Sequence, residues 1–252
     1  MFVDTHCHIH ESYELPIDEV LQRAVAAGVG EYICVGTSEQ SSEQAIEFAE
    51  THDSTCASIG VHPHDTKDGY DAIATLAGSS SKIIAVGEIG LDYFYTHSPR
   101  EVQLEALEAQ IQVALKHSLP IIFHVREAFD DFWPVFDKYP GIKGVLHSFT
   151  DSAENLQKAL ERGLYIGVNG ISTFTKDEAQ KAMFDAIPLN RLLFETDAPF
   201  LTPAPFRGKI NEPAYVKLVA EYHANRRGIP LDDIAAATTA NARTLFSLNT
   251  IS

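Results

Sequence analysis

The chain has 252 residues, a length that fits one large α/β domain or two small ones, and its 45% of hydrophobic residues are ample for a substantial core. Its formal net charge of −16, from 19 Lys and Arg against 35 Asp and Glu, argues against coating a long nucleic-acid duplex, which needs a basic face. Three cysteines without a C-x-x-C spacing exclude a disulfide framework and a thiolate zinc site. We expect a single domain over residues 1–252.

No basic N-terminal stretch precedes an apolar segment, and no apolar run approaches the roughly 20 residues that cross a bilayer. We therefore expect a cytoplasmic protein without a membrane partner or an obligate protein partner. The acidic charge still permits a short nucleic-acid end to enter a pocket. Surface charge is largely screened beyond about 8 Å at physiological salt, and bound divalent metals reverse its sign locally.

Short apolar runs alternate with helical patterns along the whole chain. The eight runs are Phe2-Val3, Tyr32–Val35, Ala57–Val61, Ile83–Val86, Ile121–Phe123, Gly144–Leu146, Leu164–Val168 and Leu192–Phe194. A short apolar run between turn signals predicts a buried strand. Eight alternations over this length predict an α/β fold with a single (β/α)8 TIM-type barrel, and a doubly wound open sheet is the competing architecture.

Helix-start signals separate these runs. The string SPRE at residues 98–101 predicts a helix with Ser98 as its cap, proline in the first turn and glutamate completing a capping box. Similar starts are expected at residues 41–44, 151–154 and 175–178. The segment from Pro213 to Leu248 predicts two closing helices, after a long proline-rich loop.

Polar residues of the kind that bind metals come directly after five of the runs. They are His6 and His8 after the first run, Glu88 after the fourth, His124 after the fifth, His147 after the sixth and Asp197 after the eighth. Such residues meet at one end of a barrel if the strands are parallel neighbours. An open sheet would collect ligands from only a few strands, so this distribution favours the barrel and requires the first and last runs to be neighbours.

The first three ligand candidates follow from strand geometry and charge. Side chains alternate between the faces of a strand, so His6 and His8 project the same way and can bind one ion. An H-x-H pair alone is a weak signal. A buried carboxylate is costly unless it is paired or coordinated, so Glu88 forms an ion pair with a loop cation or bridges two ions through its two oxygens. We expect Asp197 to complete the first site, and His124 with His147 to complete the second.

Nitrogen and oxygen ligands without thiolate fit a site for two divalent metal ions. These ions can be Zn²⁺, Mg²⁺ or Mn²⁺, and the sequence does not distinguish among the three metals. Two such ions about 3.5–4 Å apart activate water, which predicts hydrolysis. Asp197 is placed to accept the proton of that water, so Asp197 and Glu88 are the catalytic candidates. Asp4 and Glu195 lie one layer deeper on the same strand faces, where each orients a ligand imidazole or forms a buried pair.

Other residues are candidates for substrate binding. Arg126 and Arg207 are expected at the mouth of the barrel, where they hold phosphate or remain solvated loop charges. His62 and His64 end the third run and either reach the substrate or serve the structure. The aromatic residues at 93–95 stack on bases or cover the barrel rim.

Six strings of this sequence resemble the successive motifs of the TatD family of metal-dependent hydrolases. They are DTHCHIH at 4–10, GVHPH at 60–64, GEIGLDYFY at 87–95, PIIFHVREA at 120–128, LHSFT at 146–150 and ETDAPFLTPAPFRGKINEP at 195–213. The resemblance runs in order over nearly the whole chain. It implies an amidohydrolase-like barrel, a divalent metal centre and DNase activity, in several members as a 3′→5′ exonuclease. It also implies one site made of His6, His8, Glu88 and Asp197 and another of Glu88, His124 and His147.

Two departures from the family pattern concern the substrate pocket. The string HSFTD at 147–151 stands where the family commonly has HCFSG, so Asp151 adds negative charge near an anionic ligand. Phe200 stands where the family usually has tyrosine, and it lacks a hydroxyl that could bind a phosphate oxygen. The ligand His147 is retained.

We therefore expect a metal-dependent phosphodiesterase, a TatD-type DNase that acts as a 3′→5′ exonuclease on single-stranded or frayed DNA ends. The first alternative is a metal-dependent amide or ester hydrolase, such as a D-aminoacyl-tRNA deacylase, because a bimetal hydroxide attacks carbonyl carbon as readily as phosphorus. A non-catalytic binding protein is the second alternative, and it is disfavoured because every ligand position is filled.

Overall fold

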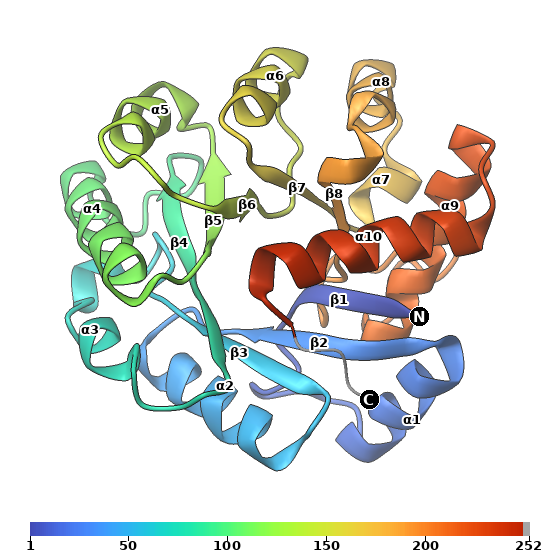
Figure 1. Cartoon of the computed structure of the whole chain (residues 1–252), viewed down its shortest axis with the longest axis horizontal. Helices are drawn as coiled ribbons and strands as arrows, with labels where there is room; N and C mark the ends of the chain where they lie inside the picture. Colours follow the sequence, from blue (N-terminus) through green and yellow to red (C-terminus); the bar gives the residue numbers. More distant parts are fainter. Residues whose placement is uncertain (249–252) are drawn as a thin grey trace. The chain divides into compact units, whose positions relative to one another are not determined.

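In a computed structural model, which describes residues 1–248, strands and helices alternate along the chain (Figure 1). The strands are β1 (Phe2–Cys7), β2 (Val29–Val35), β3 (Thr55–Ile59), β4 (Ile83–Asp92), β5 (Ile121–Arg126), β6 (Gly144–Leu146), β7 (Tyr165–Val168) and β8 (Leu192–Phe194). Each of the eight apolar runs is thus confirmed as a strand. The largest difference is in β4, which continues six residues beyond the predicted run.

The strands form one sheet in the order of the sequence, from β1 to β8. In addition, β1 lies beside β8. The Thr5 hydroxyl donates a hydrogen bond to the Phe194 carbonyl at 3.1 Å, and Cys7 forms a parallel bridge with Ala198. A doubly wound sheet reverses its strand order at a switch point, whereas this order does not reverse. The prediction of a (β/α)8 barrel is therefore confirmed.

The chain forms two compact units, and each is described by itself. The first unit is Met1–Ile33 together with the chain from Ser148 onward. Its helices are α1 (Ile17–Ala27), α6 (Ala153–Glu161), α7 (Ile171–Phe174), α8 (Glu178–Ala186), α9 (Val216–Arg227) and α10 (Leu231–Phe246). The last two are the predicted closing helices. Both pack against β1 and β8, and α10 lies alongside β1 in Figure 1, since Ile234, Ala242 and Leu245 form a buried stripe on it.

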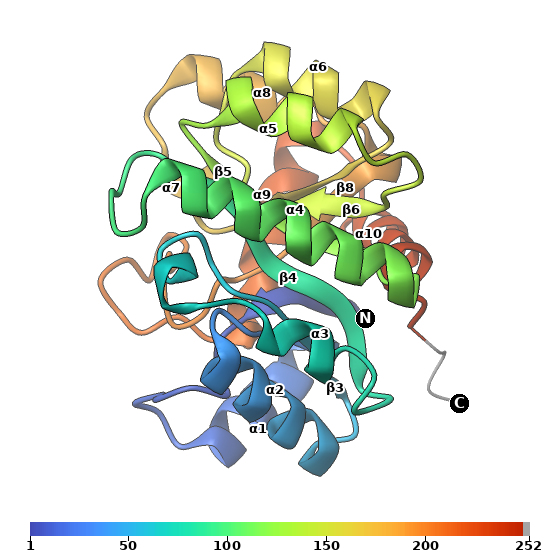
Figure 2. The same cartoon turned by 90° about the vertical axis from the view of Figure 1, so that its left-hand side faces the viewer.

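The second unit is Cys34–His147, built on the parallel pairs from β3 to β6. Its helices are α2 (Glu39–Thr51), α3 (Ala72–Leu76), α4 (Arg100–His117) and α5 (Phe129–Asp137). Helix α2 packs on β3 and α4 packs on β4, as Figure 2 shows for α4. Leu107 and Ile111 of α4 are fully buried, and the Phe123 ring of β5 lies 5.1 Å from the Phe132 ring of α5.

The helix starts were predicted in the right places, but the capping residues were wrong. Helix α4 has no side-chain cap, because the Ser98 hydroxyl has other partners. It donates a hydrogen bond to the His64 carbonyl at 2.7 Å and accepts one from the backbone amide of Lys67. Ser38, Ser152 and Asp177 cap α2, α6 and α8, one to three residues away from the expected caps. A tertiary partner competes for a hydroxyl as effectively as the local helix does.

One irregularity in the β4–β5 pair positions a site residue. Val86 pairs with Ile121 and Ile89 pairs with Phe123. Between these two pairs β4 therefore advances by three residues while β5 advances by two. An extra residue of this kind bends the strand and redirects the side chains next to it. Glu88 therefore lies at a bulge inside β4, and the prediction that it follows the end of the strand is wrong. None of the helices in residues 1–248 is long and apolar enough to cross a bilayer.

Candidate metal centre

In the first unit, backbone hydrogen bonds align β1 with the segment that follows β8. The amide of Asp197 donates to the His6 carbonyl at 2.8 Å, and the amide of His8 donates to the Ala198 carbonyl at 2.7 Å. Asp197 has a φ of +59°, a left-handed conformation that aspartate tolerates better than most residues. This pairing brings the Asp197 carboxylate to the two imidazoles of β1.

The donor atoms of His6, His8 and Asp197 have the spacing of metal ligands. The two Nε2 atoms lie 3.1 Å apart, and Oδ1 of Asp197 lies 3.3 Å from Nε2 of His8 and 3.7 Å from Nε2 of His6. Ligand atoms about 2.1 Å from an ion are separated by about 3.0–3.4 Å in tetrahedral or octahedral coordination. Two of the three separations fall in this range and that between His6 and Asp197 is 0.3 Å longer, so the three groups could hold a divalent ion after a small adjustment.

Asp4 supports this cluster through the backbone. It is fully buried and accepts hydrogen bonds from the hydroxyl of Thr196 at 2.6 Å and from its amide at 2.8 Å. Burial raises the pKa of Asp4 to about 8, although the hydrogen bonds from Thr196 act in the opposite direction. Asp4 thus positions Thr196, the residue next to Asp197. The sequence suggested, as one alternative, that Asp4 orients a ligand imidazole, but these two hydrogen bonds come from Thr196.

Glu195, the other candidate for a supporting role, anchors the start of the segment after β6. Its Oε1 accepts the amide of Ser148 at 2.6 Å, and the Ser148 hydroxyl accepts a hydrogen bond from Asn169 at 2.8 Å. Gly167 makes room for the carboxylate, because a Cβ at that position would overlap the Glu195 oxygens. Glu195 is therefore held in a buried polar network within the first unit.

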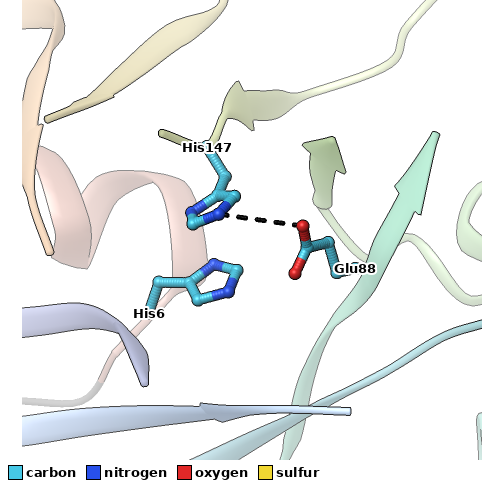
Figure 3. Close-up of side chains that lie close together, drawn as sticks. All are labelled: His6, Glu88 and His147. Atoms are coloured by element: carbon cyan, nitrogen blue, oxygen red, sulfur yellow. Dashed lines mark ion pairs between the residues drawn. The ribbon is translucent and has the colours of Figure 1, made fainter. Parts of the chain in front are cut away.

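In the second unit, His124 of β5 lies between two carboxylates of β4. Its Nδ1 is 2.7 Å from Oε1 of Glu88, and its Nε2 is 3.0 Å from Oδ2 of Asp92. Nε2 of His62 and Nε2 of His147 lie 3.6 Å and 3.7 Å from the same Glu88 oxygen, the latter as the ion pair drawn in Figure 3. This unit thus gathers His124 and His147, as predicted, with Glu88.

Burial and hydrogen bonds shift the pKa values of this second group. Burial acts to raise the pKa of Asp92, but hydrogen bonds from His124 and from the Tyr95 amide outweigh it and hold the pKa well below its usual value. Burial acts to lower the pKa of His124, and its bonds to the two carboxylates raise it. Burial holds the pKa of His62 well below its usual value. His62 is therefore neutral at pH 7, while Asp92 is charged.

Asp92 is the site residue that sequence reasoning missed. Its Oδ2 accepts from His64 at 3.0 Å as well as from His124, and its Oδ1 accepts the amides of residues 94 and 95. A signal was available: Asp92 follows Glu88 by four positions, so alternation places both on one face of a strand. It was overlooked because the predicted strand ended at Val86.

Both arginines predicted to bind substrate lie over aromatic rings. The guanidinium carbon of Arg126 is 3.9 Å from the centre of the Phe94 ring and 4.9 Å from that of Tyr95. These two rings are 48% and 42% exposed. Arg207 lies 3.8 Å from the centre of the Phe174 ring. Contact with a ring fixes each cation while leaving its charge available, and phosphate binding by these residues stays a prediction.

The two departures from the family pattern have different environments. Asp151 accepts the amide of Ser152 and the side-chain amide of Asn155, so its charge serves the start of α6. Phe200 is 58% exposed, and its ring centre lies 6.4 Å from that of His8. It lines a cavity of about 270 Å³ together with Lys209. An exposed ring thus borders the His6–His8–Asp197 cluster.

Comparison with known proteins gives consistent results over the whole chain. Residues 3–247 match a family model described as TatD related DNase. The chain is 39% identical to the uncharacterized metal-dependent hydrolase YabD of Bacillus subtilis, over 99% of this chain and 100% of that one. It is 38% identical to the 3′-5′ ssDNA/RNA exonuclease TatD of Citrobacter rodentium, with 92% of each covered.

A solved structure agrees with the fold. The crystal structure of YjjV, a TatD homologue from Escherichia coli K12, has a TM-score of 0.90 and 32% identity, and the match covers 98% of both chains.

Proposed function

Because the chain belongs to the TatD related DNase family and is a metal-dependent hydrolase, we propose that it removes nucleotides from the 3′ end of single-stranded or frayed DNA. The observation that carries this proposal is the spacing of His6, His8 and Asp197, which suits a divalent ion. A relative named as a 3′-5′ ssDNA/RNA exonuclease supports the polarity and the substrate class.

We propose a centre for two divalent ions that uses the ligands expected from the sequence. One ion would be held by His6, His8 and Asp197, and the other by His124 and His147. Glu88 would be a further ligand, because its carboxylate is buried and a buried carboxylate is costly unless it is paired or coordinated. The donor set contains no thiolate, so it fits Zn²⁺, Mn²⁺ or Mg²⁺.

The chain's own residues then have defined tasks. When bound, the ions lower the pKa of a water molecule and offset the charge of the phosphate. Asp197 accepts the proton of that water, since its side chain is 14% exposed and can be reached from solvent. Arg126 and Arg207 bind phosphates beside the scissile bond. Phe94, Tyr95 and Phe200 offer exposed faces on which bases can stack.

Digestion of a 5′-labelled single-stranded DNA oligomer tests this proposal, with Mg²⁺, Mn²⁺ or Zn²⁺ supplied in turn. We expect a ladder that shortens from the 3′ end. Asp197→Asn should lower kcat by about 10²-fold or more, because it removes both a carboxylate ligand and a proton acceptor. The matched control is Asp185→Asn, which alters an aspartate paired with Arg226 and should retain activity.

Intact DNA in the presence of metal-loaded wild-type protein would overturn the nuclease proposal. Aminoacyl esters and amides would then be the substrates to examine with the same variants. Full activity in Asp197→Asn would show that another group accepts the proton.

A further inference from the structure

We propose that His62 is a hydrogen-bond donor for an anionic substrate oxygen and is not a metal ligand. The class of oxygen, a phosphodiester oxygen, rests on the proposed function. The assignment of His62 as a hydrogen-bond donor, and not as a metal ligand, rests on the geometry of the second unit alone.

The position of His62 by itself suggests a ligand. It follows β3, and its amide donates to the Thr37 carbonyl at 2.8 Å. A ring nitrogen of His62, an oxygen of Glu88 and a ring nitrogen of His124 all lie within 4.8 Å of one another, a grouping that could hold an ion. The His62 ring centre is 4.4 Å from that of His124. Distance therefore does not separate the two imidazoles.

The hydrogen bonds of the rings do separate them. The backbone amide of His64 donates to Nδ1 of His62 at 3.2 Å. An N–H group can donate only to a ring nitrogen that carries a lone pair, so Nδ1 of His62 is unprotonated. The single proton of the neutral imidazole is then on Nε2, the nitrogen that faces Glu88.

His124 has the opposite arrangement. Its Nε2 lies 3.0 Å from Oδ2 of Asp92, and a charged carboxylate only accepts hydrogen bonds, so Nε2 carries the proton. Nδ1 of His124 lies 2.7 Å from Oε1 of Glu88, so it faces a carboxylate and would bind an ion by exchanging its proton for that ion. A metal-binding histidine usually donates its second N–H to a carboxylate or carbonyl. His124 has such an acceptor in Asp92. In His62, by contrast, the second nitrogen, Nδ1, itself accepts a hydrogen bond from the His64 amide.

The Nε2–H group of His62 is available to a substrate. The 3.6 Å to the Glu88 oxygen exceeds a hydrogen bond, and the side chain is 12% exposed. Within residues 1–248, the backbone contacts of His62 fix its position without using this N–H. A fixed neutral donor beside a metal centre stabilises negative charge as it develops on an oxygen. Loss of one such donor costs about 10²–10³-fold in kcat.

The test compares His62→Gln, whose amide retains an N–H donor, with His62→Leu, which has none. His124→Leu is the control for a lost ligand. Bound metal is measured after dialysis, and the affinity of each metal-loaded protein for inorganic phosphate is measured by calorimetry. We expect both His62 variants to retain the metal content of wild type while His124→Leu loses metal. Phosphate affinity should fall about tenfold or more in His62→Leu and recover in His62→Gln, because a hydrogen bond to a charged group contributes about 1.5–3 kcal/mol.

Loss of metal from both His62 variants, to the extent seen in His124→Leu, would show that His62 is a ligand and overturn the proposal. Equal phosphate affinity in wild type and His62→Leu would overturn it as well. The kcat and KM of DNA digestion are measured in parallel for the same proteins. Failure of the wild type to cut DNA would refute the proposed substrate, while metal content and phosphate affinity would still decide the role of His62.

Discussion

Burial lowers the pKa of two histidines in this protein, but their surroundings give them different roles. His223 in α9 is fully buried, and burial lowers its pKa to about 3. Its Nε2 lies 3.0 Å from the Ser172 hydroxyl, and its ring centre lies 5.6 Å from that of Phe194. His62 is also held neutral by burial, yet its side chain faces Glu88 and is partly exposed. The first imidazole belongs to the core, and we assign the second to substrate binding.

Stability should depend on pH through His223. Its folded pKa of about 3 lies below the value of 6.5 for an unperturbed histidine. As the pH falls, the unfolded chain therefore gains a proton before the folded chain does. The contribution of His223 is complete above about pH 6.5 and is lost as the pH falls toward 3, by about 1.4 kcal/mol per pH unit.

Urea unfolding in the presence of a chelator measures this effect, with His223→Gln as a variant that cannot titrate. Between about pH 7.5 and pH 5.5, the free energy of unfolding of wild type should fall by about 1 kcal/mol more than that of the variant. The chelator removes the contribution of metal binding. An equal fall in both proteins would mean that His223 titrates normally in the folded state.

At the scale of the element, β4 positions the candidate ligands of the second unit. Its bulge opposite β5 places Glu88 against His124. Four residues later, the two oxygens of Asp92 have separate tasks. Oδ2 holds the imidazoles of His64 and His124, and Oδ1 holds the turn at residues 94–95, which carries exposed aromatic rings. One carboxylate of β4 thus links the orientation of His124, a candidate ligand, to the turn that carries the exposed rings of Phe94 and Tyr95.

Asp92→Asn should therefore weaken metal binding about 10- to 100-fold, because an amide is a weaker acceptor for the N–H of His124. Competition with a chromophoric chelator measures the affinity, and Asp185→Asn is the matched control in the other unit. Thermal unfolding in excess chelator separates this effect from a general loss of stability. Unchanged affinity in a folded Asp92→Asn protein would show that His124 is oriented without Asp92.

At the scale of the whole molecule, the net charge of −16 would limit the proposed contact with nucleic acid to a few phosphates. The two arginines proposed for that contact, Arg126 and Arg207, are each fixed over an aromatic ring. A protein with so few phosphate contacts should prefer single-stranded or frayed ends to a long duplex. Equal rates on blunt duplex and single strands would contradict this expectation.

The salt dependence of KM for a single-stranded oligomer measures the number of phosphate contacts. Two contacts should give a slope of about 1.4 in a plot of log KM against log salt, so KM should rise less than about tenfold between 50 and 200 mM. Arg126→Gln should lower the slope by about 0.7, and Arg226→Gln, whose arginine pairs with Asp185, should leave it unchanged. A slope of about 5 or more would require a much larger basic contact.

Much of the fold was predictable because strands and their order depend on local apolar patterning. Each apolar run became a strand, and the ligand types after the runs favoured the barrel that the strand order confirms. Helix caps were harder to predict, since Ser98 gives its hydroxyl to the His64 carbonyl, a partner distant in sequence. The extension of β4 through Asp92 was missed for the same reason, because its pairing with β5 continues beyond the apolar run.

The sequence by itself determined the alternation of strands and helices, the family and the types of ligand, because these depend on residue type and spacing. Tertiary structure alone decided what each ligand-type residue faces. His62 and His124 are the same residue type near the same carboxylate, yet the His64 amide makes one a donor and Asp92 makes the other a candidate ligand. That difference depends on which nitrogen keeps a lone pair, and only neighbours brought together by folding can set it.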